Sequence, residues 1–271
     1  MITLLKIEWL KIKKYKPFWF ILIFLLILFP LATIGAGEFF KNIVAQLTQG
    51  QPDIVRNNLP SPFDYKYVFL TSAWINNGLN IAWGMLLILM IGTEFQNRTL
   101  RQNVIDGQNR SDIITSKLFL ILIFSLISAT LIIISGIISA AIYSRSGTLM
   151  DGGIPKVFGI SFVAAVMQLL FAMLFGFFIK RPAFAVIIYL GYTIFIENVI
   201  VYFIFRGLLG FQYGRLFLTQ AADELTVSPE RIIAPDNVDS LHTAAPWIAC
   251  TIYAALILFV LYRYINKTIL K

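Results

Sequence analysis

The sequence is poor in the residues on which most soluble proteins and enzymes depend. Charged residues make up only 13% of its 271 positions, and it has one cysteine and one histidine. Cys250 alone cannot form an intrachain disulfide, and the single imidazole of His242 argues against a multi-histidine metal site or a metalloprotease. The sequence has no G-x-x-x-x-G-K-[ST] phosphate loop, so we do not expect this chain to bind and hydrolyse ATP by itself. No catalytic residue, metal site or cofactor is therefore expected in this chain.

Long apolar runs replace these features. Hydrophobic residues make up 58% of the chain and the mean hydropathy is +0.79, which is typical of a multi-pass membrane protein. The runs can cross about 30 Å of hydrocarbon and lack the alternation of barrel strands. They predict an all-α polytopic fold with six transmembrane helices in a single domain, residues 1–271. The expected spans are Phe18–Ile34, Val68–Ile91, Leu118–Tyr143, Val157–Ile179, Ala183–Phe205 and Ala244–Tyr262.

The basic residues indicate the orientation of these spans. With both termini on the cytoplasmic side, the inner segments hold 14 of the 22 basic residues and only 4 acidic ones. An excess of Lys and Arg in cytoplasmic loops is the usual arrangement, so we expect a multi-pass protein of the cytoplasmic membrane with both termini inside. The net charge of +8 then reflects topology and contact with anionic lipid. We do not expect nucleic-acid binding, because no basic face lies outside the segments next to the membrane.

Three segments flank the spans. Residues 1–17 place apolar residues such as Trp9 on one helical face among lysines, which predicts an amphipathic interfacial helix. The same lysines before an apolar run also match a signal peptide, but that leader would be unusually long. We expect Pro30 to break or kink the first span as it leaves the bilayer. The outer segments 35–67 and 206–243 are expected to hold short surface helices, and 206–243 could re-enter the outer leaflet if protein shields its backbone.

Polar residues inside the spans are candidates for a passage or a dimer interface. Ser72, Asn76 and Asn80 recur at intervals of four residues, so they form one stripe on the second span. Such a stripe either lines a passage or bonds neighbouring helices together, and bonding between helices is the commoner role. Gln168 in the fourth span allows both interpretations. Glu197 is the only acid within a span, and we favour a structural ion pair or a helix break near the outer interface over a proton relay.

A polar segment, residues 93–117, separates the second and third spans on the predicted cytoplasmic side. We expect a helix from Glu94 onward, supported by a Glu94–Arg98 pair at i, i+4. Gly107 is a typical helix stop, and Ser111 is expected to be the N-cap of the next helix. These signals therefore predict a helical hairpin that extends out of the membrane.

The sequence of this hairpin, G-T-E-F-Q-N-R-T-L-R-Q-N-V-I-D-G-Q-N-R-S-D-I-I-T-S-K, resembles the membrane subunits of the type-2 export family of ABC transporters. The shared pattern is an acid, then R-T-L-R, then a glycine, an arginine and a lysine, within a six-span plan that begins with an amphipathic helix. In that family the segment contains a coupling helix that docks on a separate ATPase subunit. By this resemblance the ATPase-coupling residues are Glu94, Arg98, Thr99, Leu100, Arg101 and Gly107.

The resemblance implies an exporter permease that works with two copies of an ABC ATPase subunit, which would bind ATP and Mg²⁺. It also implies a homodimer or pseudo-symmetric dimer of permease chains, with substrate passing between them. Two other functions are compatible with the same residues. One is a non-transporting scaffold that recruits a cytoplasmic partner through residues 93–117, and the other is an ion-coupled carrier that uses Glu197.

Overall fold

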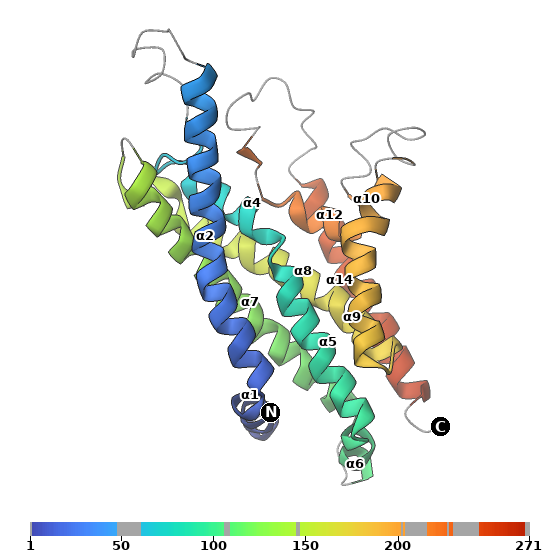
Figure 1. The fold of residues 1–271 in the computed structure, drawn as a ribbon. Helices are drawn as coiled ribbons and strands as arrows, with labels where there is room; N and C mark the ends of the chain where they lie inside the picture. The colour runs from blue at the N-terminus through green and yellow to red at the C-terminus, as the bar shows by residue number, and fades with distance from the viewer. Residues whose placement is uncertain are drawn as a thin grey trace.

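The computed structural model describes residues 2–47, 61–105, 109–144, 147–201, 203, 216–226, 228–229 and 244–268. Every regular element in these ranges is helical. Figure 1 shows a bundle in which α1, α6 and the C-terminal end of α14 lie at one end, called the α1 end below. The opposite end carries α10 and α12 and is called the α12 end. The all-α fold class is confirmed for the described residues.

Long helices alternate with short ones along the described part of the chain. Their bounds are α1 Ile2–Lys14, α2 Lys16–Leu47, α4 Val68–Asn77, α5 Asn80–Gln96, α6 Thr99–Ile105, α7 Arg110–Tyr143, the 3₁₀ turn η1 Leu149–Gly152, α8 Ile154–Phe178, α9 Pro182–Leu190, the π-helical η2 Gly191–Ile196, α10 Glu197–Val199, α12 Leu218–Asp223 and α14 Ala245–Thr268.

Among the described residues, five helices are long and apolar enough to cross a membrane, and the count is six if the bent pair of α4 with α5 forms one span. The predicted six spans lie within this range. The second span, predicted as one helix, is therefore broken: its halves meet at an angle of 41° around Gly78. The fifth span is continuous through α9, η2 and α10, with a π-helical stretch directly before Glu197.

The first span is longer than predicted and passes through Pro30 without ending. α2 continues to Leu47, so the beginning of the expected outer loop 35–67 extends the span and is not a separate surface helix. Proline removes one backbone hydrogen bond, but membrane helices tolerate it where neighbouring groups compensate. The prediction that Pro30 would break the helix is wrong.

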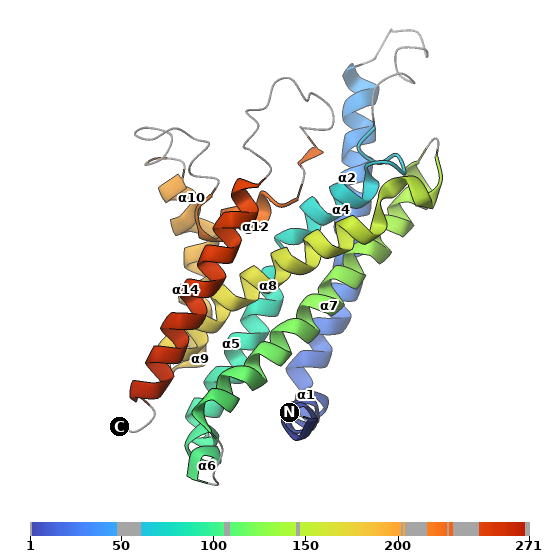
Figure 2. The same ribbon diagram turned by 180° about the vertical axis from the view of Figure 1, so that it is seen from behind.

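The core lies where α8 packs against α5 and α7. Of the five single-helix spans among the described residues, α8 has the largest buried share, with 67% of its most apolar window inside the bundle, whereas the corresponding shares are 22% for both α2 and α14. Figure 2 shows α8 running between α7 and α14. A ring cluster of Phe18, Trp83 and Phe124 joins α2, α5 and α7, with centroids 5.3–6.4 Å apart. The outer helices α2 and α14 thus have most of their apolar residues on the outside of the bundle.

Candidate functional site

The polar segment between the second and third spans contains a sharp turn that the sequence did not predict. α5 ends at Gln96, and Arg98 has φ +56°, the left-handed conformation that non-glycine residues rarely adopt. The Thr99 hydroxyl donates to the carbonyl of Glu94, which satisfies an exposed end of α5. The prediction was a helix from Glu94 that either continues past the membrane or turns along its surface. The segment is helical on both sides of Arg98, but the turn there interrupts the helix and separates α5 from the short helix α6.

α6 is anchored on one side and exposed on the other. Leu100 is buried at 4% exposure, whereas Arg98 and Thr99 are exposed and Ile105 is 72% exposed. α7 then begins at Arg110 with Asn109 at the N-cap position, so the predicted Ser111 cap is wrong by two residues. The exposed face of α6, including an apolar Ile105 that the sequence analysis did not name, is available for contact with another molecule.

A group of four charges, three buried and one partly exposed, lies behind α6 at the α1 end; we call Glu8, Lys11, Glu94 and Lys117 the charge cluster. Lys117 Nζ lies 2.7 Å from Glu94 Oε1 and 3.2 Å from Glu8 Oε1. Lys11 Nζ lies 3.1 Å from Glu8 Oε1 and 3.0 Å from Glu94 Oε1. The Lys117 side chain is only 1% exposed. The cluster therefore joins α1, α5 and α7 through two acidic and two basic side chains whose charges cancel.

The contacts of Glu8 and Lys11 favour their charged forms. Burial disfavours the charged form of Glu8, but Lys117 and Lys11 outweigh it and hold the pKa of this carboxyl below its ordinary value of 4.5. Burial likewise opposes the charge on Lys11, yet Glu94 and Glu8 raise the pKa of its ammonium above 10.5. Glu8 therefore stays negative and Lys11 stays positive at every pH between 4.5 and 10.5. The ionic link between α1 and the rest of the bundle thus persists across the physiological pH range.

The predicted coupling residues therefore have different environments. Glu94 does not pair with Arg98, because the turn removes Arg98 from the helix; it pairs with Lys11 and Lys117 instead. Arg101 lies on α6, and Gly107 lies outside the described residues. Glu8, Lys11 and Lys117 were not named as site residues. Each of the three is a charged residue next to an apolar segment. The negative charge of Glu94 at the membrane boundary needs a positive partner, and this need was the signal that could have identified them.

The predicted passage residues lie between helices of one protomer. Ser72, Asn76 and Asn80 are all 0% exposed. The Asn76 amide donates to Thr33 Oγ1 of α2 at 2.8 Å and to Ser135 Oγ of α7 at 3.1 Å. Ser72 also contacts Ser135, and the Ser128 hydroxyl of α7 donates to the Asn80 amide oxygen. In this conformation the stripe bonds α2, α4, α5 and α7 together. Gln168 is also buried, at 6% exposure.

Glu197 is held by the segment that follows the fifth span. Its carboxylate accepts hydrogen bonds from the Thr219 amide and hydroxyl and from the Gln220 amide, at the start of α12. Arg206, the nearby basic residue that could form the expected ion pair, lies outside the described residues. The alternative prediction, a helix break at Glu197, is wrong, because the helix continues through Glu197 with a π-helical stretch, η2, directly before it. α12 packs against α8 and α14, so this part of residues 206–243 returns to the bundle. Glu197 thus fixes α12 in place.

Asp223, on the same short helix, was not identified from the sequence. It accepts a hydrogen bond from the Asn77 amide at the break between α4 and α5. Burial raises the pKa of Asp223 to about 7, and Glu197 and Glu224 add to the rise, which the Asn77 hydrogen bond opposes. The contact therefore links a titratable group to the bent span.

The raised value makes the stability of the α12 end depend on pH. Because the folded state holds this proton more tightly than the unfolded chain, the contribution of Asp223 is greatest below its ordinary pKa of 3.8 and is lost as pH rises towards about 7. We expect thermal unfolding in detergent to show a melting temperature that falls from pH 5 to pH 8, and Asp223→Asn to reduce this fall. If the melting temperatures of the wild-type protein and of Asp223→Asn fell equally from pH 5 to pH 8, Asp223 would not be the source of the pH dependence.

Comparison with known families identifies the family of this chain. A family model described as ABC-2 family transporter protein matches residues 4–197, which include the charge cluster, α6 and five of the six spans. The chain belongs to this family. No curated protein and no solved structure matches it. As an ABC-2 family member it is a membrane subunit that is not itself catalytic.

Proposed function

We propose that this ABC-2 family chain is the permease subunit of an exporter that moves a substrate across the cytoplasmic membrane. A separate ATPase subunit supplies the energy by binding ATP with Mg²⁺. Two observations support this division of labour: the family match, and the absence of a phosphate loop from the sequence. The implied assembly holds two permease chains, identical or pseudo-symmetric, and two ATPase subunits.

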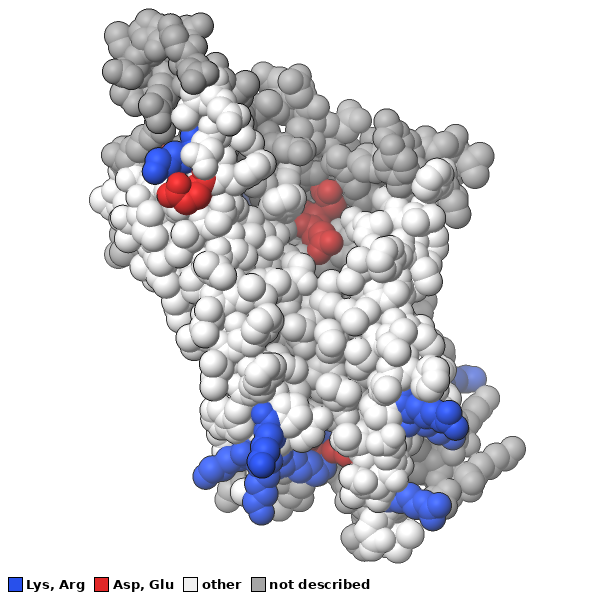
Figure 3. All heavy atoms as spheres, viewed as in Figure 1, with Lys and Arg blue, Asp and Glu red and all other residues white. Residues whose placement is uncertain are grey.

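The proposed orientation places the α1 end in the cytoplasm. In the view of Figure 3, most basic side chains gather at that end, while acidic ones are prominent nearer the α12 end. This asymmetry is the pattern that directs membrane insertion, with the basic end retained inside. Both chain termini and α6 are then cytoplasmic, where an ATPase can reach them.

The observation that carries the proposal is that α6 is exposed on one side and held against the bundle on the other. Arg98 in the turn before α6 and Thr99 and Ile105 on α6 are exposed, whereas Leu100 of the same helix is buried. Directly behind it, the charge cluster joins α1, α5 and α7, and a cavity of about 300 Å³ opens between α1, α5 and α6. A displacement of α6 is therefore transmitted to α1, α5 and α7 through packing and through the ionic contacts of the charge cluster. Movement of the ATPase subunits could shift them as a rigid body.

Charge reversal at the turn tests this coupling. In vesicles that contain the permease with its ATPase, we expect Arg98→Glu to lower coupled ATP hydrolysis by about tenfold, as for an interface arginine in direct contact. Arg181→Glu is the matched control, because Arg181 is an exposed arginine at the same end that lies before α9 and not in the turn before α6. Equal activity of the two variants would contradict a contact at Arg98.

A second variant separates contact from backbone geometry. Arg98→Gly relieves the left-handed conformation, so we expect an unchanged or higher melting temperature together with the same loss of coupled hydrolysis. Substrate uptake into inverted vesicles completes the test. Binding of the ATPase without any substrate movement would favour a recruiting scaffold over an exporter.

A further inference from the structure

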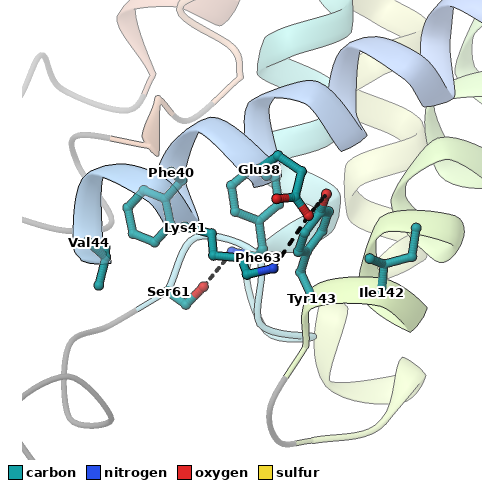
Figure 4. A pocket seen from close by; sticks show the side chains of 9 residues that line it. Glu38, Phe40, Lys41, Val44, Ser61, Phe63, Ile142 and Tyr143 are labelled. Atoms are coloured by element: carbon teal, nitrogen blue, oxygen red, sulfur yellow. Dashed lines mark hydrogen bonds and ion pairs between the residues drawn. The ribbon is translucent and has the colours of Figure 1, made fainter. Parts of the chain in front are cut away.

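A cavity of about 220 Å³ opens at the α12 end of α2, on the opposite side of the membrane from the charge cluster. Figure 4 shows Glu38, Phe40 and Lys41 of α2 on one side of it, with Phe63 and Tyr143 facing them. These residues have no part in the proposed ATPase contact. The cavity therefore needs its own explanation.

Its position along α2 corresponds to the level of the lipid headgroups. The apolar helix begins at Lys16, and Gly37 at the cavity follows 21 residues later, which is about 32 Å along a helix. The hydrocarbon core is about 30 Å thick, so the cavity lies just beyond it. Tyr143, the last residue of α7, lines the cavity at the same level.

The cavity offers one charge of each sign. The Tyr143 hydroxyl, which also donates to the Ile34 carbonyl at 2.9 Å, lies 3.1 Å from Glu38 Oε1, and Lys41 Nζ lies 3.6 Å from the same oxygen. The side chains of Lys41 and Glu38 are 59% and 50% exposed. An exposed pair of this kind adds little stability of its own, so both groups can bind an external partner of opposite charges.

Aromatic rings line the wall beside the carboxylate. The centroid of Phe63 lies 6.0 Å from that of Phe40 and 5.7 Å from that of Tyr143. Ring faces attract ammonium groups, and a neighbouring carboxylate strengthens that preference. Gly37 makes this arrangement possible, because a Cβ there would lie 2.4 Å from the Tyr143 ring. The wall is thus suited to a cation, with Lys41 nearby for an anion.

Apolar side chains continue from the cavity towards the membrane centre. Ile27 and Leu31 are 60% and 59% exposed, and their spacing places them on the same side of α2 as Glu38. On α7, Ile138 and Ile142 are also exposed, at 37% and 54%. A molecule with its polar end in the cavity would therefore meet a lipid-facing surface directly below it.

We propose that this cavity binds a zwitterionic phospholipid through its headgroup. The ammonium lies against Glu38 and the rings of Phe40 and Tyr143, the phosphate lies against Lys41, and an acyl chain follows Ile27 and Leu31. Charge complementarity selects this ligand over an anionic lipid, which would bring no cation to Glu38. The site does not depend on the ATPase, so it can be tested on the purified chain.

Native mass spectrometry of the full chain in detergent, with phosphatidylethanolamine or phosphatidylglycerol added at equal concentration, tests the proposal. We expect the wild-type chain to retain phosphatidylethanolamine about fivefold more than phosphatidylglycerol. Equal retention of the two lipids, or retention of neither, would overturn the proposal.

Variants locate the binding. Glu38→Gln and Phe40→Leu are each expected to reduce phosphatidylethanolamine retention by about fivefold, the loss of one charge or ring contact. Lys156→Gln is the control, because Lys156 is exposed at the same end and does not line this cavity. Melting temperatures measured in parallel show that the variants are folded. Retention by folded Glu38→Gln that equals that of Lys156→Gln would rule out this site.

Discussion

Lys117→Met is expected to lower the free energy of unfolding by about 3–5 kcal/mol, the usual cost of removing one partner from a buried ion pair. Methionine keeps the length and packing of the lysine stem but removes its charge. Glu8 and Glu94 would then share only Lys11, whose side chain is 34% exposed. An uncompensated negative charge would remain in a site where Lys117 is 1% exposed. Thermal unfolding of the purified protein in detergent measures the loss.

A double variant distinguishes charge balance from simple loss of packing. Lys117→Met combined with Glu94→Gln removes one charge of each sign and leaves the Glu8–Lys11 pair, 3.1 Å apart. We expect this protein to recover most of the lost stability, because replacing a buried ion pair as a unit is often nearly neutral. A double variant no more stable than Lys117→Met would show that the charge cluster does not act through its balance.

The fold was predictable where one physical requirement dominates. Apolar length fixed the spans, so the third span ends at Tyr143 both in the prediction and in the structure. Prediction failed where helices continue beyond the apolar run, as α2 does to Leu47, since hydropathy marks the membrane and not the end of the helix. It also missed the break near Gly78, where the only signal was one glycine among amide side chains.

The site was predictable only in part, because its geometry depends on long-range contacts. The segment containing α6 was identified, but the turn at Arg98 uses a conformation that residue preferences would not assign to arginine. The local rule paired Glu94 with Arg98 four residues away. Tertiary structure instead pairs it with Lys11, 83 positions away, and Lys117, 23 positions away. Spacing along one helix cannot reveal partners on two others.

Gly92→Ala is expected to lower the free energy of unfolding by about 1–3 kcal/mol, the typical cost of forcing extra atoms into a packed core. Gly92 lies on α5 where this helix meets the start of α9. An added Cβ would lie 2.5 Å from Pro182 Cβ and 2.9 Å from Pro182 Cα. Neither atom can rotate away, because both belong to a proline at the beginning of α9. The two helices would have to separate.

Gly159→Ala provides the matched control. Gly159 is also inside a helix, α8, but an added Cβ there meets nothing within 4 Å. Alanine has the higher helix propensity, so this variant should be neutral or more stable by up to about 1 kcal/mol. The same substitution therefore has opposite signs at the two glycines if close approach of α5 and α9 holds the fifth span in place. A Gly92→Ala protein that melts at or above the temperature of Gly159→Ala would refute that role, because it would mean that α9 can move aside without loss of packing.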